Sequence, residues 1–292
     1  MAKGNIAGLF AMQVFKLYNN RSYGQIADPT TPGTNVTSHA YLVDNVVEAT
    51  MPEFSFERAT FKGGGQYLGS MTIGISDVPE IPMVFSDIDD TLIQLCGGGA
   101  SDTTTLGGAE ISGMNELNPD PNRIGIFLTS KFHSRASGSE GEFKYRTLFM
   151  AGQMRFSQPQ LSHAGGENPS SLRGIFYPQV VSRFPNGVAF GANQSFYKNK
   201  AVMVQLVTDK PLAMTTYIAD GTATTYTLAY LPAKSTVTGG NTDANWITKA
   251  AVATAPSSIS TSTGVVTIAS AGTAADYHNA IYGVRDSSFP VP

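Results

Sequence analysis

Apolar and polar side chains alternate with a period of two through most of this sequence. Within residues 67–76, one side of an extended chain carries Tyr67, Met71, Ile73 and Ile75, and the other side carries Ser70, Thr72 and Ser76. This pattern is typical of a half-buried β-strand. Residues 53–62 alternate similarly, and the glycines at 63–65 suit a turn, so these two segments predict an antiparallel hairpin.

Other segments rich in β-branched and aromatic residues predict further strands. They are residues 12–18, 124–129, 143–156, 172–177, 202–207, 214–218 and 225–230. The chain is therefore predicted to be mainly β, and its strands to form an antiparallel β-sandwich.

One α-helix is predicted at about residues 86–96. Ser86 is placed to cap it, acidic residues follow at the positive end of its dipole, and Leu92 and Leu95 share an apolar face. Gly97 is expected to end it. Weaker helical patterns cover residues 243–252 and 274–282. A single well-capped helix among many strands indicates a sandwich with one flanking helix.

Composition changes near Lys210, after which charged residues are few and Ser and Thr are numerous. Residues 1–210 are thus predicted to form the β-sandwich domain. Residues 211–292 are predicted to be β-rich, either as an added module or as the completion of the first sandwich. Clusters of Gly, Pro, Asn, Ser and Thr predict long loops. These loops are expected at residues 27–35, 97–121 and 164–171.

The composition restricts the classes of function. Only 14% of the 292 residues are charged and the net charge is −3, which lacks the basic footprint of a tight nucleic-acid binder. The single cysteine, Cys96, excludes an intramolecular disulfide framework and a multi-cysteine metal site. No window approaches the roughly 20 apolar residues of a membrane span. The apolar start of the chain, interrupted by Gln13, is expected to be a strand rather than a signal peptide.

One segment has the spelling of a catalytic motif. An apolar run leads into Asp87, Asp89 and Thr91, a D-x-D-x-T pattern that resembles the first motif of haloacid dehalogenase-type phosphotransferases. The resemblance implies that Asp87 is the nucleophile, that Asp89 is the acid and base, and that both help to hold magnesium. Thr129 and Lys131 would stand in for the later phosphate-binding motifs. The competing interpretation is the acidic first turn of a helix, because β-hairpins follow where that family needs crossover helices.

The remaining patterns assign no catalytic, cofactor or metal site. The four histidines, His39, His133, His163 and His278, are too far apart in sequence to predict a metal site. The triple glycines at 63–65 and 97–99 are interpreted as turns. A mildly basic stretch with interleaved aromatic residues could bind a nucleic acid. The alternation of its side chains instead favours a position for the basic residues on a solvated or subunit-facing side of a sheet. This stretch comprises Lys131, Arg135, Lys144, Arg146 and Arg155.

The order of the predicted elements carries a second resemblance. An early strand and a long polar excursion precede residues 46–99, which contain the segments EFSFER, GQYLGSM and DDTLIQLCGGG. Residues 143–177 then place a GGENP loop between strands. This layout resembles the major tail tube protein of long-tailed bacteriophages. The resemblance implies a β-sandwich subunit that forms hexameric rings, and rings that stack into a tube around a tape-measure protein and later pass double-stranded DNA.

The leading expectation is therefore a non-enzymatic structural protein of a virion, assembled in the bacterial cytoplasm. The resemblance also implies tail terminator and baseplate partners. Unpaired strand edges would pair with neighbouring copies, and low charge suits flanks buried between subunits. The alternatives are the magnesium-dependent phosphatase and a capsid decoration or receptor-binding protein, the latter suggested by the Thr/Ser-rich end.

Overall fold

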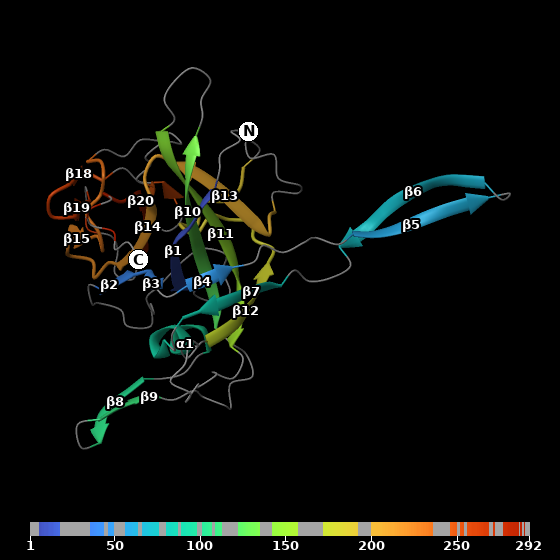
Figure 1. Ribbon diagram of the computed structural model, residues 1–292. Coiled ribbons are helices and arrows are strands. Elements are labelled where there is room, and N and C mark those ends of the chain that lie inside the picture. The colour runs from blue at the N-terminus through green and yellow to red at the C-terminus, as the bar shows by residue number, and fades with distance from the viewer. Residues whose placement is uncertain are drawn as a thin grey trace.

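The structure of the protein, a computed structural model, is mainly β and antiparallel, which confirms the fold class predicted from the alternation (Figure 1). It describes residues 6–17, 36–43, 46–49, 56–63, 66–75, 80–86, 89–97, 101–106, 109–112, 122–134, 142–156, 172–191, 200–235, 246–249, 252–253, 256–268, 271, 277–285, 287 and 289.

The largest sheet, called here the main sheet, curls on itself. Its strand order is β3 (Tyr41–Val43), β1 (Ile6–Lys16), β10 (Arg123–Ser134), β11 (Glu142–Phe156), β12 (Leu172–Gln179), β7 (Ile81–Phe85) and β4 (Val46–Ala49), and β13 (Met203–Thr208) also pairs with β11. The outermost strands β3 and β4 are separated in the chain by residues 44 and 45 alone. Since three Cα-to-Cα steps span at most about 10 Å, the two ends of the sheet must lie close together.

The inner face of the main sheet encloses one hydrophobic core. Met83 of β7 and Ile126 of β10 are buried there, and helix α1 (Asp90–Gly97) packs Leu92 and Cys96 against them. The predicted helix therefore exists, and its apolar side contacts the interior of the curled sheet. Burial raises the pKa of the Cys96 thiol, and the nearby Asp89 charge adds to this shift.

A second sheet covers part of the outer face of the main sheet. Its order is β17 (Val252–Ala253), β16 (Trp246–Lys249), β20 (Tyr277–Gly283), β14 (Leu212–Ile218) and β2 (Val36–His39). Phe15, Phe127 and Phe149 of the main sheet share a core with Met214 and Ile281 of this sheet. The expected boundary after Lys210 thus lies between β13 and β14, and strands on its two sides share one core.

A small third sheet packs on the far side of the second. It contains β15 (Thr225–Thr227), β19 (Val265–Thr267) and β18 (Ser258–Ile259). Tyr226 and Val266 of this sheet are buried against Tyr217 and Ala280. Because β14 has a layer on each side, every residue of this strand is buried.

The two weaker helical predictions, at residues 243–252 and 274–282, are wrong. The described residues there form β16, β17 and β20 instead. In β20 six of the seven residues are buried, since the strand lies between two layers. A strand buried on both faces lacks the alternation of apolar and polar residues that distinguishes a strand from a helix. The hydrophobic periodicity of β20 therefore could not identify it as a strand.

The predicted loop at 97–121 contains a hairpin that the sequence reading missed. Strands β8 (Ser101–Leu106) and β9 (Ala109–Ser112) pair with each other in this segment. Two β-prone runs separated by Gly-Gly are typical of a hairpin. The segment was predicted to be a loop because it is also rich in Gly, Pro, Asn, Ser and Thr. The other two predicted loops, at 27–35 and 164–171, lie outside the described residues.

The tyrosines beside β14 predict a loss of stability in alkali. Burial raises the pKa of Tyr282 to about 12, and burial likewise raises the pKa of Tyr226, whose ring stacks on Tyr217 at 4.8 Å. An unfolded tyrosine titrates near pH ~10. The free energy of unfolding should therefore be fully retained below that pH and fall as the pH rises towards 12.

Urea unfolding at a series of pH values from neutral to alkaline tests this. The Tyr282→Phe variant should lose less stability than the wild type over the alkaline range, because one titrating group is removed. It should also be less stable at neutral pH by about 1 kcal/mol, since the Tyr230 amide donates to the Tyr282 hydroxyl at 3.1 Å. Equal alkaline losses in both proteins would contradict the assignment.

Candidate assembly surfaces

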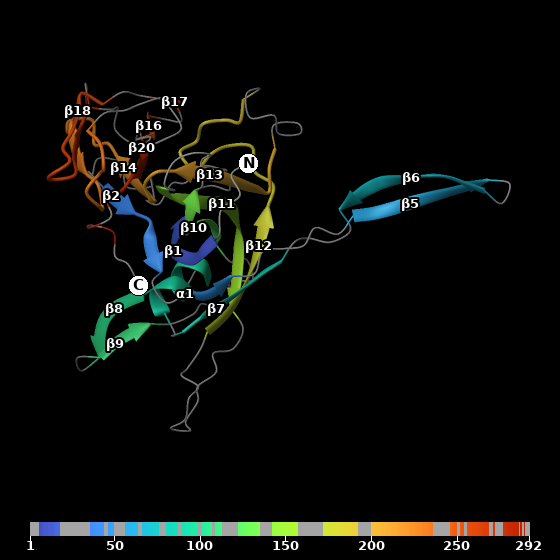
Figure 2. The ribbon, with the colours of Figure 1, turned by 45° about the horizontal axis from the view of Figure 1, so that its top comes forward.

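Two hairpins stand clear of the body of the protein. Strands β5 (Phe56–Gly63) and β6 (Gln66–Ile75) pair only with each other among the described residues, as do β8 and β9. Both hairpins project in the two views of the ribbon, and the β5–β6 hairpin reaches furthest (Figures 1 and 2). The hairpin predicted from residues 53–62 and 67–76 is thus confirmed. Its position away from the core was not predicted from the sequence.

The free edges of the larger sheets differ in length. Strands β3 and β4 at the ends of the main sheet have three and four residues, and β17 and β2 at the ends of the second sheet have two and four. Short edge strands are a common protection against unwanted pairing. Strand β13 is longer, with six residues, and in the described part of the chain it pairs only with β11. Strand β13 is therefore one candidate for the unpaired edge that was expected to meet a neighbouring copy.

Asp89 caps helix α1. Its carboxylate Oδ1 accepts a hydrogen bond from the Leu92 amide at 3.0 Å, and its carbonyl accepts the Ile93 amide at 3.0 Å. The Tyr41 hydroxyl donates to Oδ2 at 2.7 Å. The predicted cap at Ser86 is wrong, because the helix begins at Asp90 and the amide of its third residue, Leu92, donates to the Asp89 side chain.

The structure does not bring Thr129 or Lys131 to Asp89. The Thr129 hydroxyl lies 3.1 Å from that of Thr147 and is buried on the outer face of the main sheet, opposite to the face that packs on α1. Lys131 lies two residues further along the same face. Asp87 is outside the described residues.

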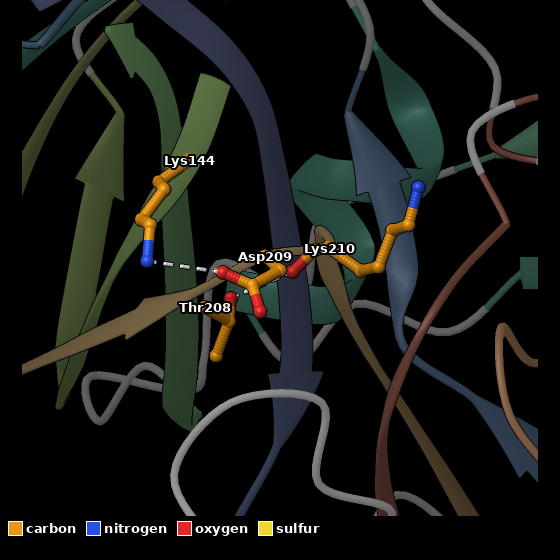
Figure 3. A network of polar contacts seen from close by, with 4 residues as sticks. All are labelled: Lys144, Thr208, Asp209 and Lys210. Atoms are coloured by element: carbon orange, nitrogen blue, oxygen red, sulfur yellow. Dashed lines mark hydrogen bonds and ion pairs between the residues drawn. The ribbon is translucent and has the colours of Figure 1, made fainter. Parts of the chain in front are cut away.

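The basic residues do not form one continuous surface. Lys144 pairs with Asp209 at 3.3 Å, beside a turn in which the Thr208 hydroxyl donates to the Lys210 carbonyl at 2.6 Å (Figure 3). On the opposite face, the Lys131 ammonium lies over the Phe143 ring, 4.9 Å from its centroid.

The remaining two described residues of this basic stretch, Arg146 and Arg155, lie on β11. The Arg146 guanidinium lies over the Phe132 ring at 5.0 Å, and Arg155 is exposed on the second half of β11. Arg135 is outside the described residues. Since Lys144 and Arg146 lie on one face of the main sheet and Lys131 of β10 lies on the other, the stretch does not present a single basic face.

The three described histidines lie on three different strands. His39 Nδ1 lies 3.2 Å from the Thr215 hydroxyl, and burial lowers the pKa of this imidazole. His278 is buried beside Tyr217 on the second sheet, and His133 lies on β10. His163 is outside the described residues. In the part of the chain that the structure describes, no three His, Cys, Asp or Glu side chains are grouped to hold a metal ion.

No protein-family model matches this chain, and a search of curated proteins finds no match. Within the described residues, no helix has the length and apolar character needed to cross a membrane.

Removing the cap at Asp89 should destabilise the fold. Asp89→Ala leaves the Leu92 amide and the Tyr41 hydroxyl without this acceptor, so we expect a loss of about 1–2 kcal/mol in the free energy of unfolding. Asp89→Asn should lose less, because asparagine also caps helices. Urea denaturation measures both, and Glu80→Ala at an exposed position serves as the control. Equal stability of Asp89→Ala and the control would disprove the cap.

Proposed function

We propose that this chain is a non-enzymatic structural protein that assembles into hexameric rings, and that these rings stack into the tail tube of a bacteriophage. The observation that carries the proposal is the β5–β6 hairpin, which projects from the body and whose strands, among the residues that the structure describes, pair only with each other. An isolated two-stranded hairpin is marginally stable in water and normally needs a third strand or a packing surface. A neighbouring subunit supplies such a surface.

The rest of the fold suits a repeating subunit. The curled main sheet, α1 and the second sheet enclose shared cores, and among the described strands neither hairpin pairs with these sheets. The body is thus a compact building block, and the hairpins are available for contacts between blocks. Head-to-tail contacts of this kind close into rings when the rotation between copies is right.

The proposed partners follow from the tube. The lumen would hold a tape-measure protein during assembly, and the ends of the tube would meet terminator and baseplate proteins. The tube would belong to the virion and form in the bacterial cytoplasm. A net charge of −3 favours transit of double-stranded DNA over tight binding, since phosphate contacts dominate DNA affinity.

Electron microscopy of the purified full-length protein tests the proposal. We expect closed rings, and stacks of rings with a central channel of uniform width. Particles that decorate a surface singly would instead favour a capsid decoration or receptor-binding protein. Magnesium-dependent hydrolysis of an aryl phosphate that is lost in Asp87→Asn would overturn the non-enzymatic assignment.

A further inference from the structure

Strand β13 has an unusually unprotected edge. Its sequence, MVQLVT, contains no charged residue, no proline and no glycine, and Val207 is 41% exposed. Natural proteins usually blunt an edge strand with a charge, a proline, a bulge or a short length. An uncharged hexapeptide of high β-propensity is also the signature of a segment that pairs with other chains. The edge of β13 therefore needs a cover in the functional state.

The geometry of β11 explains why this edge is free. Strand β11 has 15 residues, and its partners divide it: β13 pairs with Tyr145–Met150 and β12 with Ala151–Phe156. Strand β13 is thus a branch of the main sheet with β11 on one side. No described strand pairs with its other side.

The β5–β6 hairpin offers a strand of matching character. All its charged residues, Glu57, Arg58 and Lys62, lie on β5, whereas β6 (Gln66–Ile75) contains none. The side of β6 away from β5 is a second uncharged edge. Its ten residues are enough to cover the six of β13.

We propose that β6 of one copy adds to the edge of β13 in a second copy, so that the hairpin extends the neighbour's main sheet. This inference rests on the proposed function and names the contact within it. Main-chain hydrogen bonds would supply the affinity, as in other cases of strand addition. Pairing the two uncharged edges avoids burial of an unpaired charge and leaves the charged strand β5 on the outside. The contact is head-to-tail, because each copy donates a hairpin and accepts another.

Lysine substitutions on β13 test the acceptor edge. Val207→Lys and Gln205→Lys change exposed positions of β13, so both variants should keep the wild-type melting temperature and lose assembly in light scattering. Val180→Lys is the matched control, since Val180 is 55% exposed and lies outside any strand. This control should assemble like the wild type. Assembly of both β13 variants at the wild-type level would overturn the inference.

A mixing experiment tests the donor. A variant lacking residues 56–75 keeps β13 but has no hairpin, whereas Val207→Lys keeps the hairpin but has a blocked edge. Each should be monomeric alone, and an equimolar mixture should form 1:1 heterodimers held by one hairpin on one intact edge. A mixture that stays monomeric while the wild type assembles would overturn the pairing and leave the proposed function standing. A wild type that never assembles would overturn the proposed function itself.

Discussion

Replacing residues 56–75 by a short Gly-Ser linker is expected to abolish assembly while leaving the melting temperature of the monomer nearly unchanged. In the described part of the chain the strands of this segment pair only with each other, and they project from the body, so their removal breaks none of the described pairings in the larger sheets. Light scattering measures the loss of assembly, and thermal unfolding followed by circular dichroism measures the stability of the remaining fold.

Two outcomes would contradict this expectation. Rings or tubes formed by the shortened chain would show that the hairpin is not an assembly element. A fall of many degrees in the melting temperature would show that the hairpin supports the fold itself.

Gly152→Ala is expected to have the largest effect on stability, with a loss of about 3 kcal/mol or more in the free energy of unfolding. A Cβ atom at this position would lie 2.1 Å from the carbonyl oxygen of Tyr177 on the paired strand β12. Backbone atoms of a central strand cannot move aside as a flexible side chain can. The substitution should therefore separate β11 from β12 locally.

Gly174→Ala is the matched control, because Gly174 is also buried and lies on β12. Its added Cβ would meet only side-chain atoms, the nearest being 3.3 Å away in the Phe156 ring, so the expected loss is below about 1 kcal/mol. Urea denaturation of both variants decides the matter. Equal losses would show that the close backbone approach at Gly152 does not limit substitution.

Much of the fold could be predicted from local patterns. The alternation in residues 53–76 located the β5–β6 hairpin, and the alternation in 143–156 located β11. In β11, Tyr145 and Thr147 are buried and the residues between and beside them are only partly buried, so the alternation there follows two faces of different burial. Strand β20 could not be recognised in the same way, because layers on both sides bury nearly all of its residues.

The candidate surfaces depend on distant contacts that a local pattern does not encode. Tyr41 and Asp89 are 48 residues apart, and their hydrogen bond exists because the main sheet curls until β3 lies near α1. The free edge of β13 likewise results from the division of β11 between two partners. The uncharged sequence of β13 was visible from the start, but its position at an edge was not.

Sedimentation velocity of the purified full-length chain over a wide range of concentrations tests self-assembly most directly. We predict a closed oligomer at low concentration and larger species at whole multiples of its mass as rings stack. A single monomeric species at every concentration and salt condition would contradict the central claim that this chain functions by joining copies of itself.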